Sequence, residues 1–301
     1  MPPDVKSFWI DAAVIQQTLE KKLADLPPFP AVVTRIMQSV NNPEISAEDL
    51  NKLISMDQGL SSKVLRIVNS SYYGFPKRIS TISDAVVILG FNTVRNLVLG
   101  VSAFGLLGQK TLPYGLDRSR FWEHSIATAT AAGVIARKRL PKLRSAPDEV
   151  FVGGLLHDLG ALFLDSYFPV QFSVAMAFAD SENKTACEAE NMVLGMDHVA
   201  VGRRIAEYWN FPPQLAAIMG GHHDPVRETE HLDMVALVHA GNWFAWELGF
   251  VPSEHTSQHP LDPVIVEWLA FDEATIETVK ADILVQVRAC KDLLRPAKDA
   301  R

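Results

Sequence analysis

Apolar residues recur at helical spacing along nearly the whole chain, and no stretch alternates apolar and polar residues as a β-strand does. The clearest apolar stripes are Val32, Val33, Ile36, Met37 and Val40 and, further on, Leu60, Val64, Ile67 and Val68. This spacing is typical of amphipathic helices that bury one face. The sequence therefore predicts an all-α fold.

Breaks in this pattern divide the chain into segments. Residues 1–25 are predicted to form a helical extension, and residues 26–106 contain five predicted helices joined by short loops. A Gly-rich break from Gly105 to Asp117 follows, and residues 117–250 then form a second helical core. After a polar loop, residues 264–295 are predicted to form one C-terminal helix that packs on this core.

Helix start and stop signals support these boundaries. Ser46 and Thr185 each precede an acidic residue at the third following position, as in a capping box. Gly90 and Gly195 stand where a helix C-terminal glycine is expected. The other predicted helices are 148–168, one that Asp117 caps, one that Asp197 caps at His198, a short one from Pro212-Pro213 to Gly220-Gly221, and 232–248.

Composition limits the classes of protein that the chain can belong to. Its 301 residues include no apolar run near the ~18 needed to cross a membrane, and its first residues do not form a secretion signal. Only Cys187 and Cys290 occur, far apart, which favours a reducing cytoplasm over a disulfide framework. The net charge of −7 disfavours binding to nucleic acid or anionic membranes. We expect a cytoplasmic protein.

Polar residues with metal-binding side chains are spread over the second core. They are His124, His157, Asp158, His198, His222, His223 and Asn242. Histidine and carboxylate bind transition metals, and a helical bundle has to collect several such ligands from different helices. Adjacent helical residues point about 100° apart, so Asp158 could bridge two metals. Residue types alone leave a metal site and ordinary core histidines both open.

Other polar residues also permit two interpretations. Arg66, Asn69, Ser70 and the Tyr72-Tyr73 pair could bind a ligand, but a polar turn that ends a helix is the favoured interpretation. His239 is expected to support a site or the core rather than bind metal. His255 and His259 lie in a polar loop and are expected to have no chemical role.

Two parts of the chain resemble the HDOD domain. The first has the entry Leu26-Pro27-Pro28-Phe29-Pro30, the run from Asp57 to Val68 before Asn69-Ser70, and the helix from Ile82 to Gly90 that ends in Leu-Gly. The second contains FWEHS, GGLLHDLG and GHHDP, which are similar to the HD-superfamily hydrolase core within the same family. Together they cover about residues 20–290 and imply an HD-superfamily-like bundle preceded by an N-terminal helical bundle.

The resemblance implies ligand roles for the histidines. His124 matches the first HD histidine, and His157 with Asp158 matches the signature pair. His198, His222 and His223 match the additional histidines of the dinuclear HD-GYP cyclic-dinucleotide phosphodiesterases. The implied metal is divalent iron, manganese, nickel or zinc, in a mononuclear or dinuclear centre.

Three departures concern catalysis. Asn242 stands where the hydrolases have their closing aspartate, and a neutral amide is a weak ligand. Ala161 replaces a phosphate-contacting lysine, and the GYP loop is absent, since His222-His223-Asp224-Pro225 runs directly into Val226. Phosphodiester hydrolysis needs a metal-activated water and positive charge for the phosphate.

We therefore expect a non-catalytic HDOD signalling module that binds a signalling protein or a small ligand, together with a divalent metal. The alternative is a metal-dependent phosphohydrolase in which Asp158 acts with a metal-bound water. The sequence does not identify the partner, the stimulus, the metal or the oligomeric state.

Overall fold

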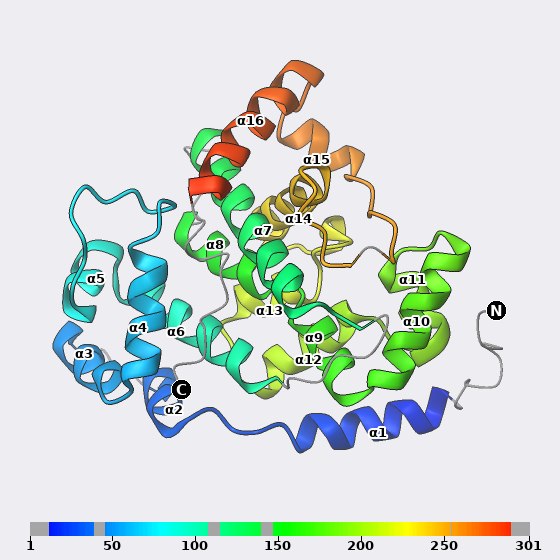
Figure 1. Ribbon diagram of the computed structural model, residues 1–301, viewed down its shortest axis with the longest axis horizontal. Coiled ribbons are helices and arrows are strands. Elements are labelled where there is room, and N and C mark those ends of the chain that lie inside the picture. The colour runs from blue at the N-terminus through cyan, green and yellow to red at the C-terminus, as the bar shows by residue number, and fades with distance from the viewer. Residues whose placement is uncertain (1–11, 39–45, 108–114, 140–146, 254, 290–301) are drawn as a thin grey trace. The chain divides into compact units, whose positions relative to one another are not determined.

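The computed structural model describes residues 12–38, 46–107, 115–139, 147–253 and 255–289 (Figure 1). Within these ranges the chain forms helices and no β-strand, which confirms the predicted all-α fold. One isolated parallel bridge pairs Thr185 with Ser257.

The chain folds as two compact units. The smaller unit comprises Pro27–Leu106 and the residues from Leu284 onward, and the larger comprises Met1–Leu26 and Leu107–Ile283.

The smaller unit contains the five helices that the sequence predicts. They are α2 (Ala31–Gln38), α3 (Ala47–Ser55), α4 (Gln58–Val68), α5 (Ile82–Leu89) and α6 (Phe91–Leu106). Ser46 and Asp49 form the predicted capping box at α3. Gly90 ends α5 with a φ of 86°, a left-handed value that glycine adopts without strain. Asn41-Asn42-Pro43, which the sequence predicts to end the helix before it, lies outside the described residues.

The larger unit is a bundle that carries the candidate metal ligands. Its elements are α1 (Ala12–Ala24), α7 (Arg118–Arg139), α8 (Pro147–Leu156), α9 (Leu159–Tyr167), α10 (Pro169–Glu182), α11 (Ala186–Leu194), α12 (His198–Tyr208), α13 (Pro213–Met219), the 3₁₀ turn η3 (Pro225–Arg227), α14 (Leu232–Glu247), α15 (Pro263–Trp268) and α16 (Glu273–Ala289) as far as Ile283. The predicted caps at Asp117, Thr185, Gly195 and Asp197 are all present.

Small residues let the backbones of this unit approach closely. A Cβ on Gly241 of α14 would lie 2.8 Å from Ala132 N and Thr128 O of α7. A Cβ on Gly160 of α9 would lie 2.0 Å from His198 O of α12. Helices that carry candidate metal ligands are therefore in direct backbone contact at these glycines.

Two helix predictions were wrong. The single helix predicted at 148–168 is broken into α8 and α9 by a turn at His157-Asp158, where Asp158 has φ −95° and ψ 14°. His157 Nδ1 lies 2.7 Å from Gly154 O, a local contact that accompanies this turn. The single C-terminal helix is two helices, α15 and α16, separated near Ala270, which has a φ of 51°. The predicted end of this helix, 290–295, lies outside the described residues.

None of the described helices is by itself long and apolar enough to cross a membrane. One pair of segments, Asp148–Tyr167 and Pro169–Glu182, is long and apolar enough for a membrane span only when taken together, and the two are bent by 117° relative to each other.

The packing at Gly160 gives the first testable prediction. Gly160→Ala is expected to lower the free energy of unfolding by about 3 kcal/mol, because its methyl group would overlap the α12 backbone. Thermal or urea unfolding of the purified chain measures this. Gly105→Ala is the control: it lies in α6 with nothing within 4 Å, so it should change stability by less than about 1 kcal/mol. Equal effects of the two substitutions would contradict the proposed close packing.

Candidate metal centre

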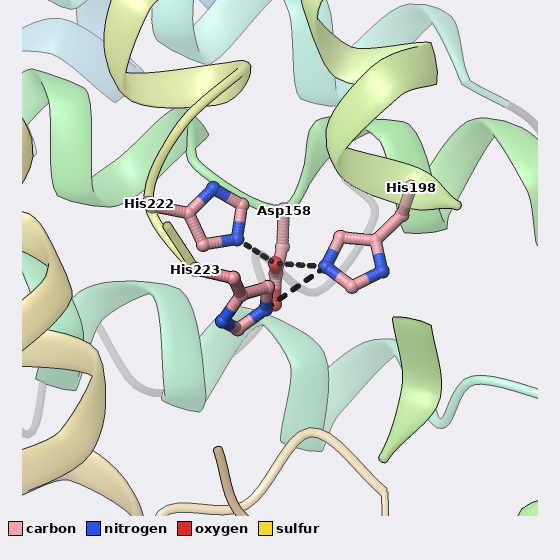
Figure 2. Close-up of side chains that lie close together, drawn as sticks. All are labelled: Asp158, His198, His222 and His223. Carbon is pink, nitrogen blue, oxygen red and sulfur yellow. Dashed lines mark hydrogen bonds and ion pairs between the residues drawn. The ribbon is translucent and has the colours of Figure 1, made fainter. Parts of the chain in front are cut away.

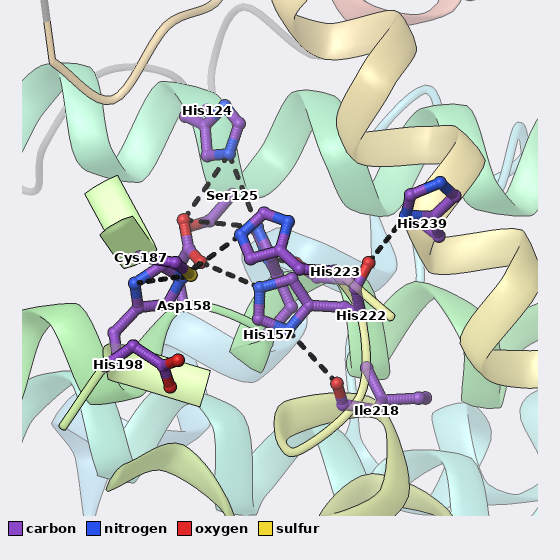
Figure 3. Close-up of polar contacts among 12 residues, drawn as sticks. His124, Ser125, His157, Asp158, Cys187, His198, Ile218, His222, His223 and His239 are labelled. Atoms are coloured by element: carbon purple, nitrogen blue, oxygen red, sulfur yellow. Dashed lines mark hydrogen bonds and ion pairs between the residues drawn. The ribbon is translucent and has the colours of Figure 1, made fainter. Parts of the chain in front are cut away.

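Four segments of the larger unit bring the predicted histidines and Asp158 together (Figure 3). His124 comes from the second turn of α7, and His157 and Asp158 come from the turn between α8 and α9. His198 begins α12, and His222-His223 follow α13. The break after Leu156 matters here, because it places both His157 and Asp158 in the cluster.

The carboxylate of Asp158 lies among these rings: Figure 2 shows it with His198, His222 and His223, and Figure 3 adds His124 and His157. Its Oδ2 is 3.6 Å from His124 Nε2 and 3.2 Å from His157 Nε2. Its Oδ1 is 3.4 Å from His198 Nε2 and 3.3 Å from His222 Nε2. Each oxygen thus faces a different pair of imidazoles.

Backbone carbonyls orient three of the rings. His124 Nδ1 lies 2.7 Å from Phe250 O, and His157 Nδ1 lies 2.7 Å from Gly154 O. His222 Nδ1 lies 3.2 Å from Ile218 O. A carbonyl only accepts hydrogen bonds, so each Nδ1 is the protonated nitrogen. In the neutral ring, each Nε2 then carries a lone pair directed at Asp158.

The fourth ring is oriented by a carboxylate. His198 Nδ1 lies 2.7 Å from Oε2 of Glu190 on α11, and the same oxygen accepts a hydrogen bond from the His198 backbone N–H. Glu190 is fully buried. A carboxylate behind a metal-binding histidine fixes the tautomer and makes the ring a stronger ligand.

Burial disfavours the protonated form of two rings in this cluster. Burial, reinforced by neighbouring His157, lowers the pKa of His124 to about 4, and burial likewise lowers the pKa of His222 to about 4. Burial by itself raises the pKa of Asp158, and only positive charge beside the carboxylate, such as a protonated His157, holds that pKa well below its usual range. Asp158 Oδ1 and His222 Nε2 lie close, yet neither has a hydrogen-bond partner. A cation between them would satisfy both lone pairs.

The donors form two groups that share Asp158. Asp158, His198, His222 and His223 make one group, and His124, His157 and Asp158 make the other. In each group the ligand atoms lie within 4.8 Å of one another. Imidazole and carboxylate donors of this kind suit divalent transition metals. The residues therefore fit a metal centre in which Asp158 is the shared ligand.

Asn242 is the one predicted ligand that offers an amide oxygen instead of an imidazole or a carboxylate. It lies on α14, is 5% exposed, and its Oδ1 is buried without a hydrogen-bond partner among the described residues. His239, one turn away, has a different role from metal binding. Its Nδ1 lies 2.7 Å from His222 O, and its Nε2 accepts the N–H of Asp262, so it fixes the backbone of a candidate ligand.

Sequence reasoning missed three residues around the centre. Glu190 orients His198, and Cys187 lies one helical turn before it, with Sγ 3.8 Å from His198 Nδ1. The ring of His259 stacks on His223 with centroids 3.6 Å apart. Cys187 and Glu190 are three residues apart and share one face of a helix, so their spacing could have indicated that both lie at the site. No such indication was present in the sequence for His259, because its position depends on the path of a loop.

The polar residues at the end of α4 hold the following loop in place and line a cavity. Asn69 fastens the following loop, with Nδ2 donating to Leu65 O and Ile79 O and Oδ1 accepting from Ile79 N, and Tyr72 is buried. Arg66 and Ser70 line a cavity of about 1010 Å³ within the smaller unit, and Asn69 lines it with them.

The fold and the cluster define an all-α protein with a buried candidate transition-metal centre. The HDOD domain model matches residues 26–225, about two thirds of the chain. The chain belongs to the HDOD domain family, as the resemblance of its motifs predicted.

Known proteins agree with this membership. An HDOD domain protein of unknown function from Geobacter sulfurreducens is 26% identical, with a TM-score of 0.69 over 95% of this chain and 99% of that chain. A candidate signal transduction protein from Marinobacter aquaeolei VT8 has a TM-score of 0.73 at 21% identity, over 98% and 68% of the two chains, and shows the fold alone. An uncharacterized protein from Treponema pallidum (strain Nichols) is 26% identical over 226 residues. That match covers 75% of this chain and 43% of the relative.

The buried rings predict a pH dependence of stability. Folded pKa values near 4, against about 6.5 in an unfolded chain, mean that the folded state resists protonation. The stability that these rings contribute is present above pH 6.5 and is lost as the pH falls toward 4. Urea unfolding of metal-free protein should therefore give a smaller free energy at pH 5 than at pH 7. His222→Gln should reduce the difference, and a difference that is absent or reversed would contradict the prediction.

Proposed function

We propose that this chain is an HDOD regulatory module that binds a divalent transition metal at the Asp158 centre and does not turn over a phosphodiester. The observation that carries the proposal is a charged carboxylate among oriented imidazole lone pairs in a nearly solvent-free site. His124, His157 and His222 are fully buried, and Asp158 is 7% exposed. Such a centre can hold a cation, whereas a bulky phosphodiester has little access to it.

The residues around the centre also favour binding over catalysis. Ala161, which is 7% exposed on α9, follows Asp158 by three residues and offers no charge to a phosphate. Asn242 contributes a neutral amide where a carboxylate would add negative charge and affinity for metal. Catalysis of phosphoryl chemistry depends on groups that stabilise the developing charge.

Metal analysis tests the proposal. Protein expressed with supplemented iron, manganese, nickel and zinc should contain about one to two metal ions per chain by elemental analysis, as one or both donor groups fill. Asp158→Asn should remove most of this metal, because both donor groups lose their shared anion. His231→Gln, a histidine outside both groups, should retain it. Metal-free wild-type protein, or full loading of Asp158→Asn, would contradict the proposal.

The alternative function, a metal-dependent phosphohydrolase, is favoured by the shared position of Asp158 between two donor groups. The same preparations separate the two functions. We expect the metal-loaded chain to hydrolyse cyclic dinucleotides with a kcat far below ~1 s⁻¹, the lower end of the usual enzyme range. Turnover at an enzyme-like rate that disappears in Asp158→Asn would establish the alternative.

We further propose that the module takes its small ligand in the cavity beside α4. The lining contains six serines, Gln58, Asn69 and two arginines, and no carboxylate occurs among the lining residues that the structure describes. This is a positive site in a chain of net charge −7. Arg66 Nε and Ser70 Oγ are buried without a hydrogen-bond partner, so a ligand with oxygen acceptors would satisfy them. These features support an anionic ligand, such as a phosphate ester.

Binding of pyrophosphate tests the cavity. Wild-type protein should bind it by calorimetry, and Arg66→Gln should weaken binding by about tenfold, the loss expected when one charge-assisted hydrogen bond is removed. Arg35→Gln is the matched control, since Arg35 lies on exposed α2 surface in the same unit and outside the cavity. No binding by wild type, or equal loss in both variants, would contradict this site.

A further inference from the structure

Cys187, His223 and His259 form a third donor group at the edge of the Asp158 centre. Their ligand atoms, a thiol sulfur and one nitrogen from each ring, lie within 4.8 Å of one another. Each of the three is partly exposed, unlike the rings of His124, His157 and His222. This group therefore lies nearer to solvent than the other two.

Three separate segments deliver these side chains. Cys187 is in the first turn of α11, beside His198 and Asp158 (Figure 3). His223 follows α13, and its Nε2 lies 3.2 Å from His198 Nε2. His259 belongs to the loop between α14 and α15.

The loop that carries His259 is fastened on both sides of it. Ser257 N donates to Lys184 O, and Ser257 Oγ donates to Asn183 Oδ1 at 2.7 Å, just before α11. Gln258 Nε2 donates to Trp243 O at 3.0 Å, and Asp262 N donates to His239. These bonds hold His259 over His223, so its place beside the centre does not depend on ring stacking alone.

Two ring nitrogens in this group make no hydrogen bond within the described residues. His223 Nδ1 and His259 Nε2 are buried and lack a hydrogen-bond partner among the described residues. Buried polar atoms are almost always satisfied, so two neighbouring exceptions beside a thiol point to a ligand. The rings lie 19° from parallel, and metal binding would require one of them to turn out of the stack.

We propose that Cys187, His223 and His259 form an outer metal position that takes Zn²⁺ or a similar borderline-soft ion. This inference rests on the proposed metal-binding function and extends it. A thiolate with two imidazoles is a zinc-type donor set that leaves a fourth coordination position open. The other two groups offer only nitrogen and oxygen, so the sulfur makes the outer position the more selective for zinc and cobalt over manganese.

A second donor set competes for Cys187, namely Cys187, Glu190 and His198. Glu190 Oε1 has no partner, but both nitrogens of His198 are engaged, Nδ1 with Glu190 Oε2 at 2.7 Å and Nε2 with Asp158. The outer set has freer donors and is the one that the geometry favours. A variant at His259 distinguishes them, because that residue belongs to the outer set alone.

Sharing of His223 connects the outer position to the Asp158 centre. His223 Nε2 faces the inner donors, while Nδ1 is the unpartnered nitrogen. A neutral imidazole has one lone pair, so the ring serves one position at a time unless it loses its remaining proton. Loading of the outer position thus withdraws a ligand from the inner group, which keeps Asp158, His198 and His222.

Titration of the full, metal-free chain with Co²⁺ tests the outer position. A bound thiolate gives a sulfur-to-cobalt charge-transfer band in the near ultraviolet, which nitrogen and oxygen ligands do not produce. We expect this band in wild-type protein, its loss in Cys187→Ser, and loss or at least a tenfold weaker Co²⁺ dependence in His259→Gln. Cys290→Ser is the matched control and should keep the band, since it changes the only other cysteine of the chain.

Each result has a defined meaning. Wild-type protein that binds Co²⁺ without the band overturns the outer position and leaves the Asp158 centre intact. A band that survives in His259→Gln but not in Cys187→Ser overturns it in favour of the Glu190 set. Wild-type protein that binds no Co²⁺ at all overturns both this inference and the proposed metal-binding function. Because His259 lies on a partly exposed loop, its variant also serves if Cys187→Ser fails to fold.

Discussion

The site depends on one interaction, that of the buried Asp158 carboxylate with the imidazole nitrogens around it. An ionised carboxylate without water costs several kcal/mol unless positive charge or donors compensate it. Here the N–H groups of His124, His157 and His222 point away from Asp158, because each Nδ1 faces a backbone carbonyl. In the neutral form, each ring therefore presents the lone pair of Nε2 to the carboxylate. Carboxylate oxygen and ring nitrogen then repel each other unless a cation lies between them. The same contacts that orient the rings therefore make the empty arrangement costly and the metal-bound one stable.

The scaffold supplies the precision that this interaction requires. Metal ligands have to be placed within a few tenths of an ångström, and the chain achieves this by bringing helix backbones together at glycines. Gly160 lets α9 reach the start of α12, where His198 stands, and Gly154 packs against Ala129 of α7, near His124. Local hydrogen bonds then set the final side-chain directions. Packing and tautomer are thus linked at His157, because Gly154 both packs against α7 and supplies the carbonyl that accepts from the ring.

The sequence predicted the features that depend on neighbouring residues. Caps such as Thr185 with Glu188 are local, and so is the helical spacing that gives the all-α fold. The break at His157-Asp158 was missed because its apolar neighbours keep a helical period through the turn. His259 was set aside as a loop residue, and only the bonds of Ser257 and Gln258 bring it to the centre. The motifs predicted which histidines converge. They did not predict which carbonyls accept from the rings, because that depends on the path of the backbone.

Exposure to solvent differs between the inner donors and the proposed outer position. The inner donors are closed to solvent, while Cys187, His223 and His259 are partly open. Burial also raises the pKa of the Cys187 thiol to about 11, so this residue binds a metal only when the metal displaces its proton. An ion that arrives from solvent meets the sulfur-containing set first and competes there for His223. Occupancy of the proposed outer position would therefore compete with the inner donor group for one ring, because His223 belongs to both groups.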